Sequence, residues 1–72
     1  MVNVNKIKGR IVENETSIAE LAKFLGIDKA TLYRKLNNNG ETLLIKEARG
    51  IIEFLHLTKD EAADIFFNHS VA

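Results

Sequence analysis

The sequence predicts an all-α fold, a compact bundle of about five short helices that forms a single domain over residues 1–72. Two observations support this prediction. Apolar residues recur at the i, i+3, i+4, i+7 spacing of helices with one apolar face. Residues suited to helix N-caps, and Gly or Asn residues suited to helix ends, divide this pattern into short segments.

The first expected helix covers residues 5–14, with Val4, Ile7 and Ile11 along one face. Gly9 lies inside it, where glycine costs ~1 kcal/mol relative to alanine, so its presence suggests a close contact at this position. Asn14 is expected to end the helix, because Asn tolerates the left-handed backbone conformation often found there.

The second expected helix begins after Ser17, which forms a capping box with Glu20. In such a box the serine hydroxyl accepts from the Glu20 N–H, and the Glu20 carboxylate accepts from the Ser17 N–H. The helix ends at Gly26. Its apolar positions are Ile18, Leu21, Ala22 and Leu25.

The third expected helix covers residues 29–37, with Asp28 as an N-cap whose carboxylate accepts from a first-turn N–H. Its inward residues are Leu32 and Leu36. The two helices are separated by too few residues for a flexible linker, so they must cross at a steep angle. Residues 17–36 therefore predict a helix-turn-helix.

Residues 37–40, three Asn followed by Gly, predict a polar loop. A fourth helix is expected to start between Thr42 and Ile45. A second capping box, Thr58 with Glu61, predicts the start of a fifth helix. The apolar residues of these two helices are Leu44, Ala48, Ile51, Ile52 and Leu55, then Ala62, Ile65 and Phe66.

The outward face of the third helix is rich in groups that can read DNA. Arg34 can form a bidentate contact with guanine, and Ala30 can lie against a thymine methyl group. Lys29, Tyr33 and Asn37 can donate hydrogen bonds to bases or phosphates, with Thr31 and Lys35 at the edges of this face. The alternative interpretation is an ordinary solvated helix face that happens to be basic.

The neighbouring positions admit the same two interpretations. The Asn loop can touch a phosphate through Asn37 or Asn38, the two Asn residues nearest the third helix, or it can only turn the chain. Gly9 can permit close approach of a neighbouring helix or of a DNA backbone.

The charge distribution is polarised although the net charge is zero. Residues 1–40 carry seven Lys and Arg against four Asp and Glu, a net charge of +3. Residues 41–72 carry three against six, a net charge of −3. The helix-turn-helix thus lies in the basic part, as expected for a nucleic-acid partner, although a split of this size also arises by chance in small proteins.

The stretch LAKFLGIDKATLYRKLN resembles the helix-turn-helix of the phage-repressor superfamily, the Cro-like or Xre family. Ala22, Gly26 and Leu32 occupy the positions where that motif requires a small residue, a left-handed turn and a buried residue. A longer stretch, KGRIVENETSIAELAKFLGIDKATLYRKLNNNGET, is similar to small phage or prophage repressor-like regulators of Gram-positive bacteria. The resemblance implies a lambda-repressor-like domain that binds a palindromic operator as a symmetric dimer.

The resemblance also implies individual contacts. Base contacts fall on Lys29, Ala30, Tyr33 and Arg34, and phosphate contacts fall on Ser17, Asn37, Asn38 and Asn39. Thr31, at the edge of the outward face of the third helix, is a further candidate for a phosphate contact, which rests on its position and not on the resemblance. Lys35 stands where the family usually has an apolar residue. We therefore expect Lys35 to face a phosphate, with Leu36 taking the buried role.

Other classes of protein are disfavoured. The chain has no cysteine, and no apolar run approaches the ~20 residues that a membrane helix needs. His56 and His69 lie in no catalytic or metal-binding motif, and His56 is expected to cap a helix end. We expect a soluble cytoplasmic protein that is not an enzyme and uses no metal, cofactor or small-molecule substrate.

A protein-interaction module is the main alternative to a DNA-binding domain. Phe66 and Phe67 are adjacent, so on a helix they cannot both face one core, and one is expected to be exposed. Such a residue could seal a homodimer, bind another regulator through the acidic C-terminal helices, or only cover the edge of its own core.

Overall fold

The computed structural model of the chain describes residues 2–67, and this part contains five helices and no strand. The helices are α1 (Val4–Glu13), α2 (Ile18–Leu25), α3 (Lys29–Asn37), α4 (Ile45–Phe54) and α5 (Lys59–Phe66). The predicted all-α class is confirmed. The predicted fraying of residues 68–72, and His69 with it, falls outside the described residues.

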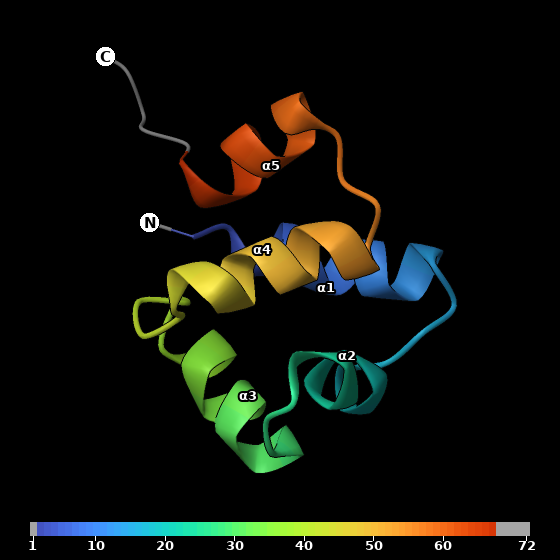
Figure 1. Cartoon of the computed structure of the whole chain (residues 1–72). Coiled ribbons are helices and arrows are strands. Elements are labelled where there is room, and N and C mark those ends of the chain that lie inside the picture. The colour runs from blue at the N-terminus through green and yellow to red at the C-terminus, as the bar shows by residue number, and fades with distance from the viewer. Residues whose placement is uncertain (1, 68–72) are drawn as a thin grey trace.

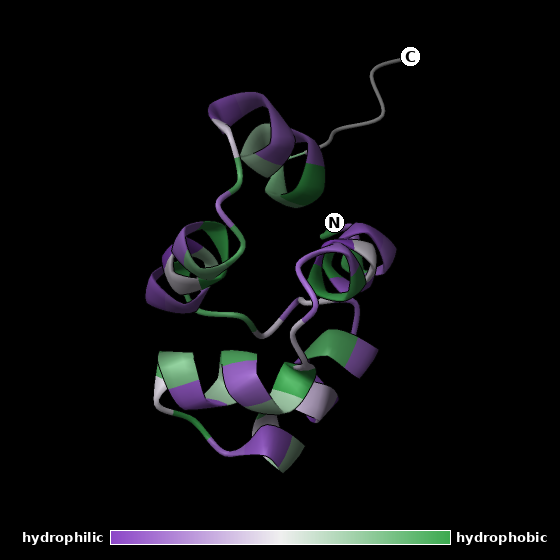
Figure 2. Cartoon of the chain, turned by 90° about the vertical axis from the view of Figure 1, so that its right-hand side faces the viewer, coloured by the Kyte–Doolittle hydropathy of each residue, from purple (hydrophilic) through white to green (hydrophobic). Residues whose placement is uncertain are grey.

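The helices form three levels. In Figure 1 α4 lies in front of α1 at the middle height of the molecule, with α5 on one side of them and the α2–α3 pair on the other. Figure 2 shows α1 and α4 end-on at this same height. α2 packs against both α3 and α4, whereas α5 packs against α1. α3 and α5 therefore occupy opposite ends of the molecule.

One hydrophobic core joins all five helices. Its most deeply buried side chains are those that the helical spacing predicted to face inward, and Figure 2 shows the apolar faces turned toward the centre. The aromatic rings of Phe24 and Phe54 lie 5.1 Å apart and join α2 to α4. The buried core residues are Ile7, Ile11, Leu21, Ala22, Leu32, Leu36, Ile51, Leu55, Leu57, Ala62, Ile65 and Phe66.

Two of the three predicted N-caps use the side chain as expected. The Ser17 hydroxyl accepts from the Glu20 N–H at 3.1 Å, and Thr58 with Glu61 forms a complete capping box. The return bond from Ser17 to the Glu20 carboxylate is not formed. Asp28 occupies the N-cap position of α3, but its carboxylate makes no cap hydrogen bond. Because Asp28 is exposed, water can satisfy the first-turn N–H groups instead.

Two predictions about backbone positions were confirmed only in part or contradicted in part. Asn14 ends α1 as predicted, but with φ −86°, and the left-handed residue is the next one, Glu15, at φ 54°. Gly9 has open space where a side chain would start, so no neighbouring helix makes a close contact there. A close contact inside a helix occurs instead at Gly50 of α4, against which the Leu25 side chain packs.

Candidate nucleic-acid interface

The connection between α2 and α3 is fixed by backbone hydrogen bonds and one left-handed residue. Gly26 has φ 73°, as predicted, and ends α2. The Ile27 N–H donates to the Ala22 carbonyl at 3.0 Å, which closes the last turn of α2. α3 then leaves α2 at a steep angle, as Figure 1 shows. Burial of Leu32 and Leu36 determines which face of α3 points to solvent.

The outward face of α3 carries the four residues predicted to contact bases. Lys29, Ala30, Tyr33 and Arg34 are all exposed. The Lys29 ammonium lies 5.9 Å from the centroid of the Tyr33 ring, and an Arg34 Nη2 donates to the Thr31 hydroxyl at 3.3 Å. The structure therefore groups these side chains on one surface.

A shallow polar hollow of about 560 Å³ adjoins this face at the C-terminal end of α3. Four of its residues are among those predicted to contact phosphate. Thr42 also lines the hollow, although no motif in the sequence marked it. The lining residues are Thr31, Arg34, Lys35, Asn37, Asn38 and Thr42.

Two other predicted phosphate contacts do not line the hollow. Asn39 has φ 59°, and its N–H donates to the Leu36 carbonyl at 3.1 Å, so it turns the chain. Ser17 stands at the start of α2, where its hydroxyl is engaged by the Glu20 N–H.

The position of Lys35 differs from the prediction. Its ammonium donates to both carboxylate oxygens of Glu47 on α4, at 2.7 and 2.9 Å, instead of pointing outward to a phosphate. Glu47 also accepts from the Leu44 N–H at 2.8 Å and is only 3% exposed. The physical reason is that an unpaired buried carboxylate is costly, and Lys35 supplies the counter-charge. No local pattern in the sequence indicates this pair, because it joins residues of two different helices.

These contacts determine the charge state of Glu47. Burial raises the pKa of its carboxyl, but the hydrogen bond from Leu44 and the ion pair with Lys35 outweigh burial and lower the pKa below its usual value of 4.5. Glu47 is therefore a charged carboxylate at neutral pH.

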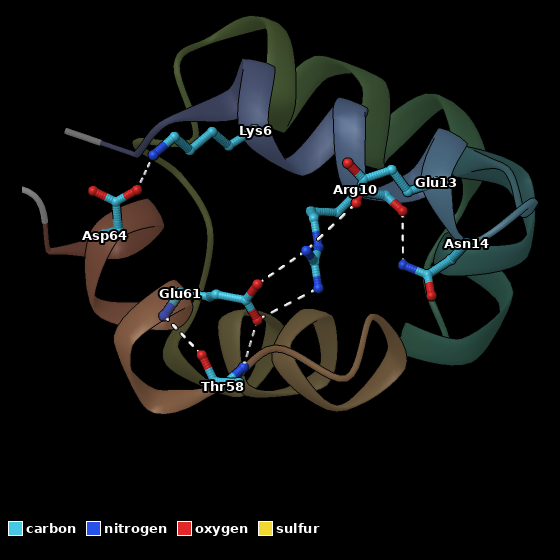
Figure 3. A network of polar contacts seen from close by, with 7 residues as sticks. All are labelled: Lys6, Arg10, Glu13, Asn14, Thr58, Glu61 and Asp64. Atoms are coloured by element: carbon cyan, nitrogen blue, oxygen red, sulfur yellow. Dashed lines mark hydrogen bonds and ion pairs between the residues drawn. The ribbon is translucent and has the colours of Figure 1, made fainter.

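A network of polar contacts joins α1 to α5 (Figure 3). Lys6 pairs with Asp64, and Arg10 pairs with Glu61 at 2.9 Å. The backbone hydrogen bond from Thr58 lowers the pKa of Glu61, and the Arg10 charge lowers it further, against a smaller opposing effect of desolvation.

Internal ion pairs modify the charge polarity predicted from the sequence. Three cations of residues 1–40, namely Lys6, Arg10 and Lys35, pair with carboxylates of residues 41–72. Within the described residues, the cations of this part that form no ion pair are Lys8, Lys23, Lys29 and Arg34. Two of these four are on the outward face of α3.

The two adjacent phenylalanines separate as expected, with one inside and one outside. Phe66 is buried in the core and also lines the groove described next, whereas Phe67 is 67% exposed. Phe67 borders an apolar groove of about 370 Å³ between α4 and α5. Leu44 and Ile45, both exposed, line the same groove.

The described residues contain no helix of the length and apolarity required to cross a bilayer. They also contain no group of three or more His, Cys, Asp or Glu placed to hold a metal ion. None of the family models, curated proteins or solved structures compared with the chain matches it.

Proposed function

We propose that this protein is a sequence-specific double-stranded DNA-binding regulator, a phage-type repressor, that reads an operator with α3 in the major groove. One observation carries the proposal. The outward face of α3 follows a fixed left-handed turn and presents Lys29 and Arg34 without ion pairs, next to Tyr33. A helix held in this way can enter a groove without rearrangement of its own charges.

The proposed contacts divide into two kinds. Arg34 and Lys29 suit guanine edges, Ala30 suits a thymine methyl group, and the Tyr33 hydroxyl can donate or accept. Phosphate contacts are assigned to Thr31, Asn37 and Asn38 at the hollow, with Ser17 and Asn39 as additional donors at helix and loop ends.

A single copy presents few free cations to the DNA backbone. Phosphate neutralisation by Lys and Arg supplies most of the non-specific affinity, so a monomer would bind weakly at physiological salt. Binding of two copies to a palindromic operator supplies the missing affinity and is part of the proposal.

Selection of bound duplexes from a random library, followed by measured affinities for wild type and Arg34→Ala, tests this function. Arg34→Ala should lose discrimination at one base step, at a cost of ~1 to 3 kcal/mol. Lys59→Ala is the matched control, because it removes an exposed cation from α5, at the opposite end of the molecule (Figure 1). Failure of every duplex to bind at low salt, or full discrimination after the Arg34 change, would refute the proposal.

The exposed Phe67 beside the apolar groove favours a second candidate, a protein-interaction module that binds another regulator through the C-terminal helices. For this function Phe67→Asp should abolish the protein complex while no duplex is bound. Retention of the complex after this change would exclude the Phe67 surface.

A further inference from the structure

Glu47 is the one charged residue of the described chain that is buried. Both of its carboxylate oxygens face the Lys35 ammonium, and one of them also accepts the Leu44 N–H. The carboxylate thus holds the lysine in a bidentate contact at the junction of α3 and α4.

Lys35 stands at the edge of the surface proposed to meet DNA. It lines the polar hollow together with Thr31, Arg34 and Asn38. Its side chain is 18% exposed, and its ammonium points to α4. A lysine at this place, with its flexible four-carbon chain, would otherwise be suited to neutralise a backbone phosphate.

We propose, on the basis of the DNA-binding function above, that Glu47 acts as an internal anion that keeps Lys35 from the DNA backbone and thereby limits non-specific affinity. Glu47 is then a residue that determines specificity, although it touches no DNA itself. A phosphate that captured Lys35 would leave the Glu47 carboxylate buried and unpaired, so the exchange is unfavourable. Discrimination then depends on contacts to bases, such as those assigned to Arg34.

The test compares wild type with Glu47→Gln and with the double variant Lys35→Met/Glu47→Gln. Glutamine keeps an acceptor for the Leu44 N–H, as in capping boxes that use Gln, but it removes the charge that holds Lys35. The probe is a 20-base-pair duplex of random sequence, and its affinity is measured between 50 and 200 mM KCl. Circular dichroism checks that each variant is folded.

Release of Lys35 in Glu47→Gln should add about one phosphate contact, which steepens the slope of log K against log salt by about 0.9. Over this salt range the variant should therefore lose about threefold more affinity than wild type. The ratio of operator to random-duplex affinity should fall. The double variant, which lacks the released cation, should have the slope of wild type.

The opposite results overturn the inference. A Glu47→Gln slope equal to that of wild type means that Lys35 is not released to phosphate. A double-variant slope shallower than wild type by about 0.9 means that Lys35 already contacts phosphate in the native protein. The double variant alone decides the matter if Glu47→Gln does not fold. Failure of the wild type to bind any duplex overturns the proposed function as well, whereas binding with unaltered slopes overturns this inference alone.

Discussion

Lys35→Met should destabilise the protein strongly at neutral pH, because it leaves the Glu47 carboxylate without its counter-charge. Removal of one partner from a fully buried ion pair costs about 3 to 5 kcal/mol. In this protein the Leu44 N–H remains bonded to the carboxylate, and the lysine side chain is 18% exposed, so part of the interaction was made near solvent. We therefore expect a loss of about 2 to 3 kcal/mol in the free energy of unfolding.

This loss is large relative to the stability of a 72-residue domain. At the usual 0.05 to 0.15 kcal/mol per residue, the whole chain is stabilised by about 4 to 11 kcal/mol. Because 1 kcal/mol shifts the melting temperature of a small domain by about 4 to 8 °C, Lys35→Met should melt roughly 10 to 20 °C below wild type. Thermal unfolding followed by circular dichroism measures this shift.

The penalty should also depend on pH, with a definite sign. In wild type the pKa of Glu47 is lowered in the folded state, so its stabilising contribution is complete above the unfolded value of 4.5 and is lost as the pH falls through the folded value. In Lys35→Met burial is no longer opposed by the lysine charge, so this contribution is reduced at neutral pH. The difference in the free energy of unfolding between wild type and Lys35→Met should therefore shrink below pH 4.5.

Lys35→Met/Glu47→Gln serves as the control, because it removes both charges and should recover part of the lost stability at pH 7. Two results would refute the reasoning. One is an equal penalty for Lys35→Met at pH 7 and pH 3. The other is a double variant that is less stable than Lys35→Met.

Three further predictions concern caps, glycines and the two phenylalanines. Gly9→Ala should stabilise the protein by about 0.5 to 1 kcal/mol, because Gly9 is helical and has open space where a side chain would start. Gly26→Ala should cost about 1 to 2 kcal/mol, because Gly26 has the left-handed φ of 73°, which alanine adopts at a cost. Chemical denaturation measures both, and a stabilising Gly26→Ala would contradict the assigned turn. Thr58→Ala should cost about 1 kcal/mol through the lost cap of α5, and an unaltered denaturation midpoint would contradict this role. Phe66→Ala should lower the free energy of unfolding by about 3 to 5 kcal/mol, because Phe66 is buried, whereas Phe67→Ala should leave the melting temperature nearly unchanged, because Phe67 is exposed. Equal effects of the two changes would contradict this difference in burial.

The candidate site was predicted only in part from the sequence. The exposure of Lys29, Tyr33 and Arg34 on α3 follows from the burial of Leu32 and Leu36, which local spacing already indicated. The prediction that Lys35 faces a phosphate was wrong, because its ammonium pairs with Glu47. Sequence spacing places a side chain on a helix face but does not identify what packs beside it.

The sequence by itself determined the helices, most of their inward residues, the left-handed turn at Gly26 and the capping box of Thr58 with Glu61. These features depend on interactions between residues a few positions apart, which leave a periodic pattern. Leu44, counted among the apolar residues of the fourth helix, is exposed. Only the tertiary structure decided which cations remain free, because Lys6 and Arg10 meet carboxylates more than fifty residues away. It likewise placed Glu47 beside Lys35. Such pairings depend on how the helices pack together, and packing brings together residues that share no local pattern.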